Sequence, residues 1–290
     1  MIPGVDVSNN NGAVAWGAIA RAGHRFAYIK ATEGLDYRDP DFADNWGNAG
    51  IAGLLRGAYH FARPQPGRTG AQEAAWFCAA MNRLGAWHKG NLPPALDLEW
   101  SSGLSAAEVH GWAGAFVAEL HRRTGRTPMI YTGRFWKHSI GNPTGSFGCP
   151  LWLAQYGPTA QVPAAWSKWT IWQHTSSGTV PGAGQLDLNR FVGSEAELHA
   201  LAQSQSEPPR PPPSPNPPAW PGQPLMQGAS GRAVSEWQQQ MHARGFATLS
   251  VDGVYGPMCA RACRWLQMYK RLQVDGIVDE RTWKATWGPA

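Results

Sequence analysis

The sequence has little cysteine and no long apolar run, and both absences narrow what the chain can be. Its four cysteines are Cys78, Cys149, Cys259 and Cys263. They are too few and too scattered for the disulfide framework of a small secreted domain, and no Cys-x-x-Cys pair suggests a zinc site. We therefore expect buried free thiols, including Cys259 and Cys263, which lie one helical turn apart. No apolar stretch reaches the roughly 20 residues of a membrane-spanning helix, so membrane insertion is not expected.

The first residues also lack the marks of a secretory signal, which are a basic segment, an apolar run and a small-residue cleavage site. Residues 1–7 pass directly into a strand-like pattern instead. We expect synthesis without a signal peptide in the cytoplasm, or in that of a host, and a route of another kind to any target outside the membrane.

Positive charge is in excess, since 25 Lys and Arg against 20 Asp and Glu give a net charge of +5 and a pI near 9.2. This balance favours an anionic partner, such as nucleic acid, a membrane surface or an anionic cell wall. The basic residues form no dense stripe, and the 16 tryptophans outnumber the 7 tyrosines, which argues against nucleic acid. Tryptophan rings suit sugars, although most tryptophans simply belong to a core.

A proline-rich segment divides the chain. Ten of the seventeen positions from Pro208 to Pro224 are proline, a composition that prevents packed elements and favours an extended spacer. We assign residues 203–224 to a linker. It separates a body of residues 1–202 from a small module of residues 225–290.

Short β-rich runs alternate with helical stretches in the body, a pattern typical of parallel strands joined by crossover helices. The runs are Gly4–Val7, Phe26–Ala31, Leu54–Phe61, Ala95–Leu98, Met129–Tyr131, Leu151–Gln155, Thr170–Gln173 and Leu186–Phe191. Eight such runs predict a closed or nearly closed α/β barrel. Capping-box pairs, Thr69 with Gln72 and Ser105 with Glu108, mark two helix starts. Proline and glycine punctuate residues 143–163, so an irregular second half is expected.

Polar residues end strand after strand of this predicted barrel. They are Asp6, Lys30, Glu33, His60, Asp97, Glu99, Tyr131, Gln155, Gln173 and Asp187. In an α/β barrel the carboxyl ends of the strands form the catalytic face. Taken singly, each residue, Asp6 among them, could cap the helix that follows its strand. Taken together, the residues indicate a functional site.

Asp97 and Glu99 are two positions apart, so both side chains point to one side of a strand, with α-carbons about 6–7 Å apart. Their apolar neighbours and mutual repulsion would both raise a carboxyl pKa. The pair suits glycoside cleavage, in which one carboxyl protonates the leaving oxygen and the other stabilises the anomeric cation. We assign Glu99 as the acid and Asp97 as the stabiliser. The alternatives are a salt-bridged pair or a site for a hard cation.

A family resemblance rests on several motifs taken together. They are Asp6-Val7-Ser8, Lys30-Ala31-Thr32-Glu33-Gly34, Gly57-Ala58-Tyr59-His60-Phe61, Asp97-Leu98-Glu99, Trp152-Leu153-Ala154-Gln155-Tyr156, Trp172-Gln173 and Asp187-Leu188-Asn189. In this order they resemble the glycoside hydrolase family 25 lysozymes across nearly the whole body.

The resemblance implies a flattened, irregular β/α barrel that cleaves the β-1,4 bond between N-acetylmuramic acid and N-acetylglucosamine in bacterial peptidoglycan, with no metal or organic cofactor. By similarity Glu99 is the general acid, Asp97 orients or stabilises the substrate, and Asp6 and Asp187 complete the acidic centre. Positions that match the sugar groove, or else pack in the core, are Tyr59, Tyr131, Trp152, Gln155 and Gln173. Lys30 and Glu33 either line the groove or form a structural ion pair. Retention or inversion at the anomeric carbon depends on the carboxylate spacing.

The C-terminal module contains an internal echo, Val251-Asp252-Gly253-Val254-Tyr255-Gly256 and Val274-Asp275-Gly276-Ile277-Val278-Asp279. Asp-Gly turns between helical segments predict a compact all-α bundle of three helices. Helical spacing assigns to its core the residues Val234, Trp237, Met241, Ala262, Trp265 and Met268.

Several short motifs of the module resemble the peptidoglycan-binding domain 1 family. They are Leu225-Met226-x-Gly228, Val234-x-x-Trp237-Gln238, the two Asp-Gly turns and Thr282-Trp283. Met258-Cys259 and Asp279 depart from the usual pattern, which bears on ligand preference more than on fold. The resemblance implies an anchor to the wall, and the alternative is a structural appendage.

The order of enzyme, linker and anchor looks like that of a bacteriophage endolysin, and a host autolysin is the alternative. Other readings are a chitinase-like or N-acetylglucosaminidase activity, and a carbohydrate-binding protein that has lost catalysis. A zinc amidase is disfavoured, since the 9 histidines lack metal-ligand spacing. Peptidoglycan is the expected partner, without nucleic acid, and protein partners stay unknown.

Overall fold

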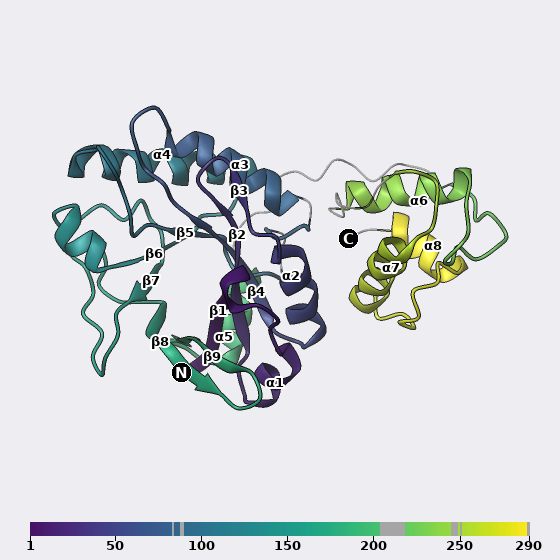
Figure 1. The fold of residues 1–290 in the computed structure, drawn as a ribbon, viewed down its shortest axis with the longest axis horizontal. Helices are drawn as coiled ribbons and strands as arrows, with labels where there is room; N and C mark the ends of the chain where they lie inside the picture. Colours follow the sequence, from purple (N-terminus) through teal and green to yellow (C-terminus); the bar gives the residue numbers. More distant parts are fainter. Residues whose placement is uncertain (83, 88–89, 204–217, 245–248, 250, 289–290) are drawn as a thin grey trace. The chain divides into compact units, whose positions relative to one another are not determined.

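The computed structural model describes residues 1–82, 84–87, 90–203, 218–244, 249 and 251–288. The chain divides into two compact units, one N-terminal and one C-terminal, each with its own core. Figure 1 shows the two units, the first mixing strands and helices and the second built of helices. Among the described residues, no helix combines the length and apolar character needed to cross a bilayer.

The N-terminal unit is a closed barrel of eight strands. They are β1 (Ile2–Val7), β2 (Phe26–Glu33), β4 (Leu55–Phe61), β5 (Ala95–Asp97), β6 (Met129–Gly133), β7 (Leu151–Ala154), β8 (Ile171–Val180) and β9 (Gly184–Phe191). The strand order is β1-β9-β8-β7-β6-β5-β4-β2, and β1 also pairs with β2, which closes the ring. A short β3 (Tyr37–Arg38) pairs with the end of β2. The eight predicted runs and the α/β barrel are confirmed.

The direction of the last strand differs from the expectation of parallel strands throughout. β9 runs antiparallel to both of its neighbours, β8 and β1. Residues 181–183 alone connect β8 to β9. A parallel crossover needs a dozen or more residues, about the length of a helix, so this connection permits only a hairpin.

Helices surround the barrel in its first half and at its end. They are α1 (Trp16–Arg21), α2 (Phe42–Ile51), α3 (Gly70–Asn82), α4 (Ala106–Thr124) and α5 (Glu195–Gln203). Both predicted capping boxes are formed at the starts of α3 and α4. Within the described residues from 134 to 183, a π turn, Phe135–Ser139, is the only helical element, as the irregular second half predicted.

Aromatic side chains fill the lower part of the barrel. The rings of Tyr28 and Trp152 are 4.5 Å apart and both are fully buried. Glycine makes room for neighbouring rings, because a Cβ on Gly4 would lie 2.4 Å from the ring of Phe26. The polar strand ends therefore stand on a packed apolar layer, which limits their freedom to move.

The C-terminal unit is the expected bundle of three helices, α6 (Arg232–Ala243), α7 (Pro257–Tyr269) and α8 (Glu280–Trp287). Val234, Trp237 and Met241 are buried as predicted. The indole of Trp283 donates to the carbonyl of Pro218 at 2.9 Å, so this unit includes residues before 225. Most of the predicted linker, residues 204–217, lies outside the described residues.

A pair of buried glutamines explains the internal echo. Gln238 of α6 donates to Asp252 Oδ1 at 2.8 Å and accepts from the Gly253 amide at 2.8 Å. Gln267 of α7 makes the same two bonds to Asp275, at 2.8 Å, and to the Gly276 amide, at 2.9 Å. Each helix thus clasps the Asp-Gly turn that follows it.

The prediction of core positions is wrong for two residues of α7. Trp265 and Met268 are only partly buried, and Trp265 stacks on Tyr269 with 5.3 Å between ring centres. The buried stripe of this helix passes instead through Cys259 and Cys263. The small thiols bring α7 close to its neighbours, and all four cysteines are buried and free, as expected.

We predict that Gly4→Ala destabilises the protein by about 1–3 kcal/mol, because the added methyl overpacks the Phe26 ring. Urea unfolding followed by circular dichroism measures the change. The matched control is Gly111→Ala, on the exposed side of α4 with no atom within 4 Å of the new Cβ. It should stabilise the helix by up to about 1 kcal/mol. Equal effects of the two substitutions would contradict the packing argument.

Candidate active site

The carboxylate of Asp6 lies at the centre of the polar strand ends. Its Oδ2 accepts from the side-chain amides of Gln173 on β8, at 2.8 Å, and Asn189 on β9, at 2.7 Å. All three side chains are buried, with Asp6 6% exposed. Hydrogen bonds to a carboxylate compensate for the water that burial removes.

Neighbouring donors fix the direction of both amides. The indole of Trp152, which can only donate, bonds to Asn189 Oδ1 at 2.7 Å, so the NH2 group of Asn189 faces Asp6. The hydroxyls of Tyr131 and Tyr156 donate to Gln173 Oε1 at 2.9 and 3.0 Å, with the same result for Gln173. The site therefore presents Asp6 with preset donors.

Asp187 lies directly across from Asp6, because β1 and β9 are antiparallel and pair these two residues. Burial, the charge of Asp6 and a hydrogen bond to it raise the pKa of Asp187 to about 8. Near neutral pH Asp187 is thus protonated and donates to the Asp6 carboxylate. Burial also raises the pKa of Asp6, while the bonds from Asn189, Gln173 and Asp187 oppose the rise.

Asp97 and Glu99 share one side of the site but differ in access to solvent. Asp97 is buried, and its Oδ1 has no hydrogen-bond partner among the described residues. Burial, followed by the charges of Glu99 and Asp6, raises its pKa well above the ordinary value. Glu99 lies just past β5 with an exposed side chain, and desolvation and the charge of Asp6 raise its pKa.

Four carboxyl groups thus meet at the mouth of the barrel, as the sequence predicted. Their mutual repulsion and desolvation keep protons on some of them near neutral pH. An exposed carboxyl with a raised pKa can donate a proton, and a buried ionised neighbour can stabilise a cation. Over the described ranges, no group of three or more His, Cys, Asp or Glu side chains is arranged to hold a metal ion.

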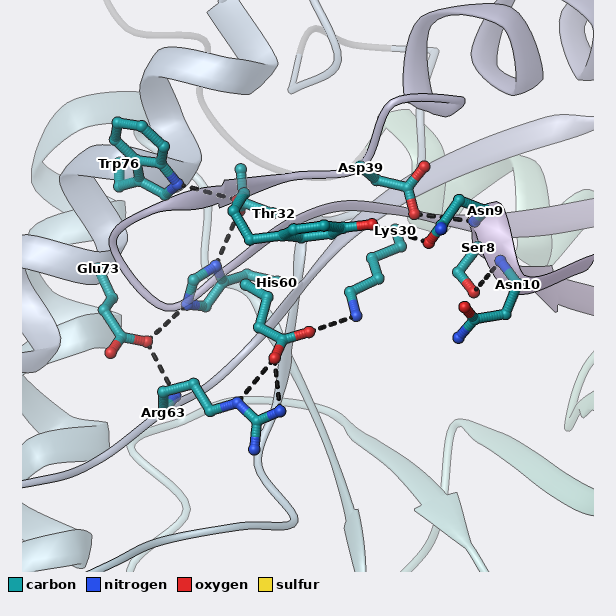
Figure 2. A network of polar contacts seen from close by, with 12 residues as sticks. Ser8, Asn9, Asn10, Lys30, Thr32, Asp39, His60, Arg63, Glu73 and Trp76 are labelled. Atoms are coloured by element: carbon teal, nitrogen blue, oxygen red, sulfur yellow. Dashed lines mark hydrogen bonds and ion pairs between the residues drawn. The ribbon is translucent and has the colours of Figure 1, made fainter.

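Lys30 and Glu33 form the ion pair that was one of their two predicted roles. Lys30 Nζ is 2.6 Å from Glu33 Oε2, and Arg63 binds the other oxygen of Glu33 at 2.5 Å through Nη2 and at 2.8 Å through Nε. Figure 2 labels Lys30 and Arg63, whose contacts to the carboxylate are drawn as dashed lines. These bonds lower the pKa of Glu33 despite its partial burial, so it stays ionised.

A second polar chain lies between the barrel strands β2 and β4 and helix α3. His60 bonds to Thr32 Oγ1 and to Glu73 Oε2, both at 2.8 Å, an arrangement of hydroxyl, imidazole and carboxylate (Figure 2). All three side chains are fully buried, and the rings of Phe77 and Phe116 flank the imidazole. Burial lowers the pKa of His60, which is therefore neutral. No substrate reaches this hydroxyl, so the group braces β2, β4 and α3.

The remaining predicted groove residues take different places. Tyr59 and Tyr131 are mostly buried beside the carboxyls, and Trp152 is 1% exposed. Trp152 thus supports the site from below and does not face it. Gln155 turns away: its amide donates to the carbonyl of Thr159 at 3.0 Å and accepts from the Gln161 amide at 3.2 Å. It braces a loop.

Sequence reasoning missed three residues of the site. Asn189 and Tyr156 stood inside the quoted motifs without a role, yet both contact the network around Asp6 through bonds to Asp6 or Gln173. The signal for Asn189 was its spacing of two from Asp187, which places both on one side of a strand. Arg63 follows the end of β4 and carried no recognisable signal.

The raised pKa of Asp187 predicts a loss of stability with rising pH. The folded protein keeps this proton up to about pH 8, whereas the unfolded chain releases it near its ordinary pKa of about 4. Stability therefore falls as pH rises through this window. Asp187→Asn keeps the donor without the titration, so at pH 8 it should be more stable than the parent by about 1–2 kcal/mol, allowing for partial solvent screening.

Urea unfolding at pH 4 and pH 8 measures this difference, which should vanish at the lower pH. The control is Asp36→Asn, whose side chain is 77% exposed. It should show no such dependence. A constant effect of Asp187→Asn at both pH values would contradict the shared proton.

Comparison with known proteins agrees with this geometry. Residues 5–183 match the model of glycosyl hydrolases family 25, and residues 230–285 match that of a putative peptidoglycan binding domain. The first match spans more than half of the chain.

Individual relatives are similar over most of their length. Lysozyme M1 of Streptomyces globisporus is 39% identical over 70% of this chain and 72% of its own. The N,O-diacetylmuramidase of a Chalaropsis species is 36% identical over 69% of this chain and 99% of its own. A crystal structure of the bacterial lysozyme from Streptomyces coelicolor has 38% identity and a TM-score of 0.64, covering 70% of this chain and 97% of that one. The chain therefore belongs to glycosyl hydrolase family 25, as a glycoside hydrolase of the lysozyme and muramidase type with a C-terminal peptidoglycan-binding domain.

Proposed function

We propose that this protein is an endolysin-type muramidase, which hydrolyses the β-1,4 bond between N-acetylmuramic acid and N-acetylglucosamine in bacterial peptidoglycan. The observation that carries the proposal is the meeting of four carboxyl groups at the barrel mouth, of which Glu99 has an exposed side chain and a raised pKa. The muramidases among its relatives support the choice of substrate.

In this proposal Glu99 protonates the leaving glycosidic oxygen. Positive charge then grows at the anomeric carbon, and the Asp6 carboxylate, held by Gln173 and Asn189, supplies a fixed negative charge nearby. We assign the orientation of the substrate's N-acetyl group to Asp97, which shares a strand end with Glu99 and keeps 6% of its surface exposed. Tyr131 and Gln173 act through Asp6.

We expect Glu99→Gln to lower turnover by about two to four orders of magnitude, since the amide cannot donate the proton that general acid catalysis requires. The side chain is exposed, so the fold and the binding to cell walls should be unchanged. Purified peptidoglycan is digested, the new ends are reduced with borohydride, and the reduced sugars are identified.

Muraminitol from the parent protein supports a muramidase, whereas glucosaminitol alone would favour the N-acetylglucosaminidase or chitinase-like alternative. Wall binding without new reducing ends would identify an inactive binding protein. The matched control, Glu236→Gln on α6 of the other unit, should retain the parental rate. A near-parental rate for Glu99→Gln would refute its assignment.

The C-terminal unit is proposed to anchor the enzyme to the wall and so raise its concentration at the substrate. The net positive charge of the chain, +5, suits an anionic wall. The order of hydrolase, proline-rich segment and wall-binding domain supports the endolysin type, and we propose that the protein acts on the bacterial cell wall after synthesis in the cytoplasm.

A variant that ends at Gln203 tests the anchor, because the barrel has its own core. We expect it to keep the rate on soluble glycan fragments but to lose cosedimentation with walls and about 10-fold or more of the rate on intact walls. The full chain with Glu99→Gln is the control and should cosediment. Equal wall binding of the truncated and full chains would show that the C-terminal unit is no anchor.

A further inference from the structure

Arg63 lies between a buried polar chain and the segment that carries Glu99, and it contacts both. Its main-chain amide donates to Glu73 Oε2 at 3.0 Å, the oxygen that also bonds to His60. Glu73 and His60 are fully buried, so this end of the connection cannot move without exposing or stranding polar groups. The backbone at Arg63 is thus fixed by the buried carboxylate of Glu73 (Figure 2).

The side chain of Arg63 is fixed as firmly as its backbone. Two of its nitrogens bind Glu33 Oε1, while Lys30 occupies Glu33 Oε2. A guanidinium with two bonds to one partner has a defined plane and position. Because two cations share one carboxylate, this cluster carries a net charge of +1.

The guanidinium packs against two aromatic rings, one at the end of β4 and one next to Glu99. It lies over the ring of Phe61, at 4.6 Å from the centroid, and over that of Trp100, at 4.8 Å. Trp100 is the residue after Glu99. A cation over an aromatic face is attracted to it, so Arg63 holds the ring of Trp100 and restricts the segment that carries Glu99.

We propose that Arg63 is a positioning residue: bound to Glu33 and stacked on Trp100, it fixes the Glu99–Trp100 segment and places a positive charge beside the catalytic acid. The inference rests on the proposed role of Glu99. Arg63 itself needs no contact with the substrate.

The charges around Glu99 act in opposite directions. Lys30 and Arg63 lower its pKa, whereas desolvation and the charge of Asp6 raise it. The groups that interact with it electrostatically are Asp6 on β1, Lys30 on β2, Arg63 after β4, Asp97 on β5, Tyr131 on β6, Tyr156 after β7 and Asp187 on β9. Glu33 on β2 faces the same region through Arg63 and Lys30. Without the charge of Arg63, the carboxyl groups around Glu99 outnumber the one remaining cation, Lys30.

Two substitutions separate charge from position. Arg63→Gln removes the charge, so Glu99 should keep its proton to higher pH, and the alkaline limb of kcat/KM should move up by about 0.5–1 pH unit. Arg63→Lys keeps the charge but cannot combine two bonds to Glu33 with a flat stack on Trp100. We expect it to leave the limb in place while kcat falls about 5-fold or more.

Both rates are measured across pH on soluble glycan fragments, with the full chain and with thermal unfolding followed in parallel. Arg68→Gln is the matched control, since it removes a positive charge from the same loop, where Arg68 pairs loosely with Asp36 at 3.4 Å. It should change neither the limb nor kcat.

The proposal is overturned if the limb is unshifted in Arg63→Gln and kcat stays near the parental value in Arg63→Lys. It is also overturned if a lower melting temperature is the only effect of the two substitutions. If Arg63→Gln does not fold, Arg63→Lys still decides the positioning role through kcat at an unchanged limb. Failure of the proposed function shows separately, as a near-parental rate for Glu99→Gln.

Discussion

The buried carboxylate of Asp6 constrains the whole barrel mouth. An unpaired charge at such a depth costs several kcal/mol, so donors must reach it from other strands. Gln173 and Asn189 supply them, and each amide is turned by a partner below or beside it, as Trp152 turns Asn189. The same charge keeps a proton on Asp187. One anion on the first strand therefore keeps the proton on Asp187 and requires the two donors that Gln173 and Asn189 bring from the last strands.

The sequence was sufficient to predict where the site lies, but not how each of its side chains is oriented. Strand ends and a spacing of two were enough to place Asp97 and Glu99 together, because the carboxyl ends of barrel strands share one face. The same reasoning could not tell which way Gln155 turns, since a residue just past a strand is free to bond its own loop. Periodicity likewise allowed two stripes on α7, and it put Trp265 in the core, although the small thiols fit there and the indole does not.

The barrel contains two groups of polar side chains, the carboxyls at its mouth and the chain of Thr32, His60 and Glu73. They differ more in access to solvent than in the types of side chain. Thr32, His60 and Glu73 have the residue types and spacing of a hydrolytic triad, yet aromatic rings enclose them and no substrate can enter. Their fixed bonds instead hold together β2, β4 and α3, next to the strands β1 and β5 that carry Asp6 and Asp97. Arg63 connects the two groups. Its main-chain amide bonds to the buried Glu73, and its guanidinium bonds to the partly exposed Glu33.

The repeated glutamine clasp of the C-terminal unit holds two turns in the same way while the outer side chains of its helices differ. Gln238 and Gln267 hold equivalent turns, so the positions two residues before them are also equivalent; these are Glu236 on α6 and Trp265 on α7. The clasp tolerates this difference in side chain, since neither residue takes part in it. One half carries the Arg232–Glu236 ion pair and the other the Trp265–Tyr269 stack, so either surface can differ without a change in the turns that the glutamines hold.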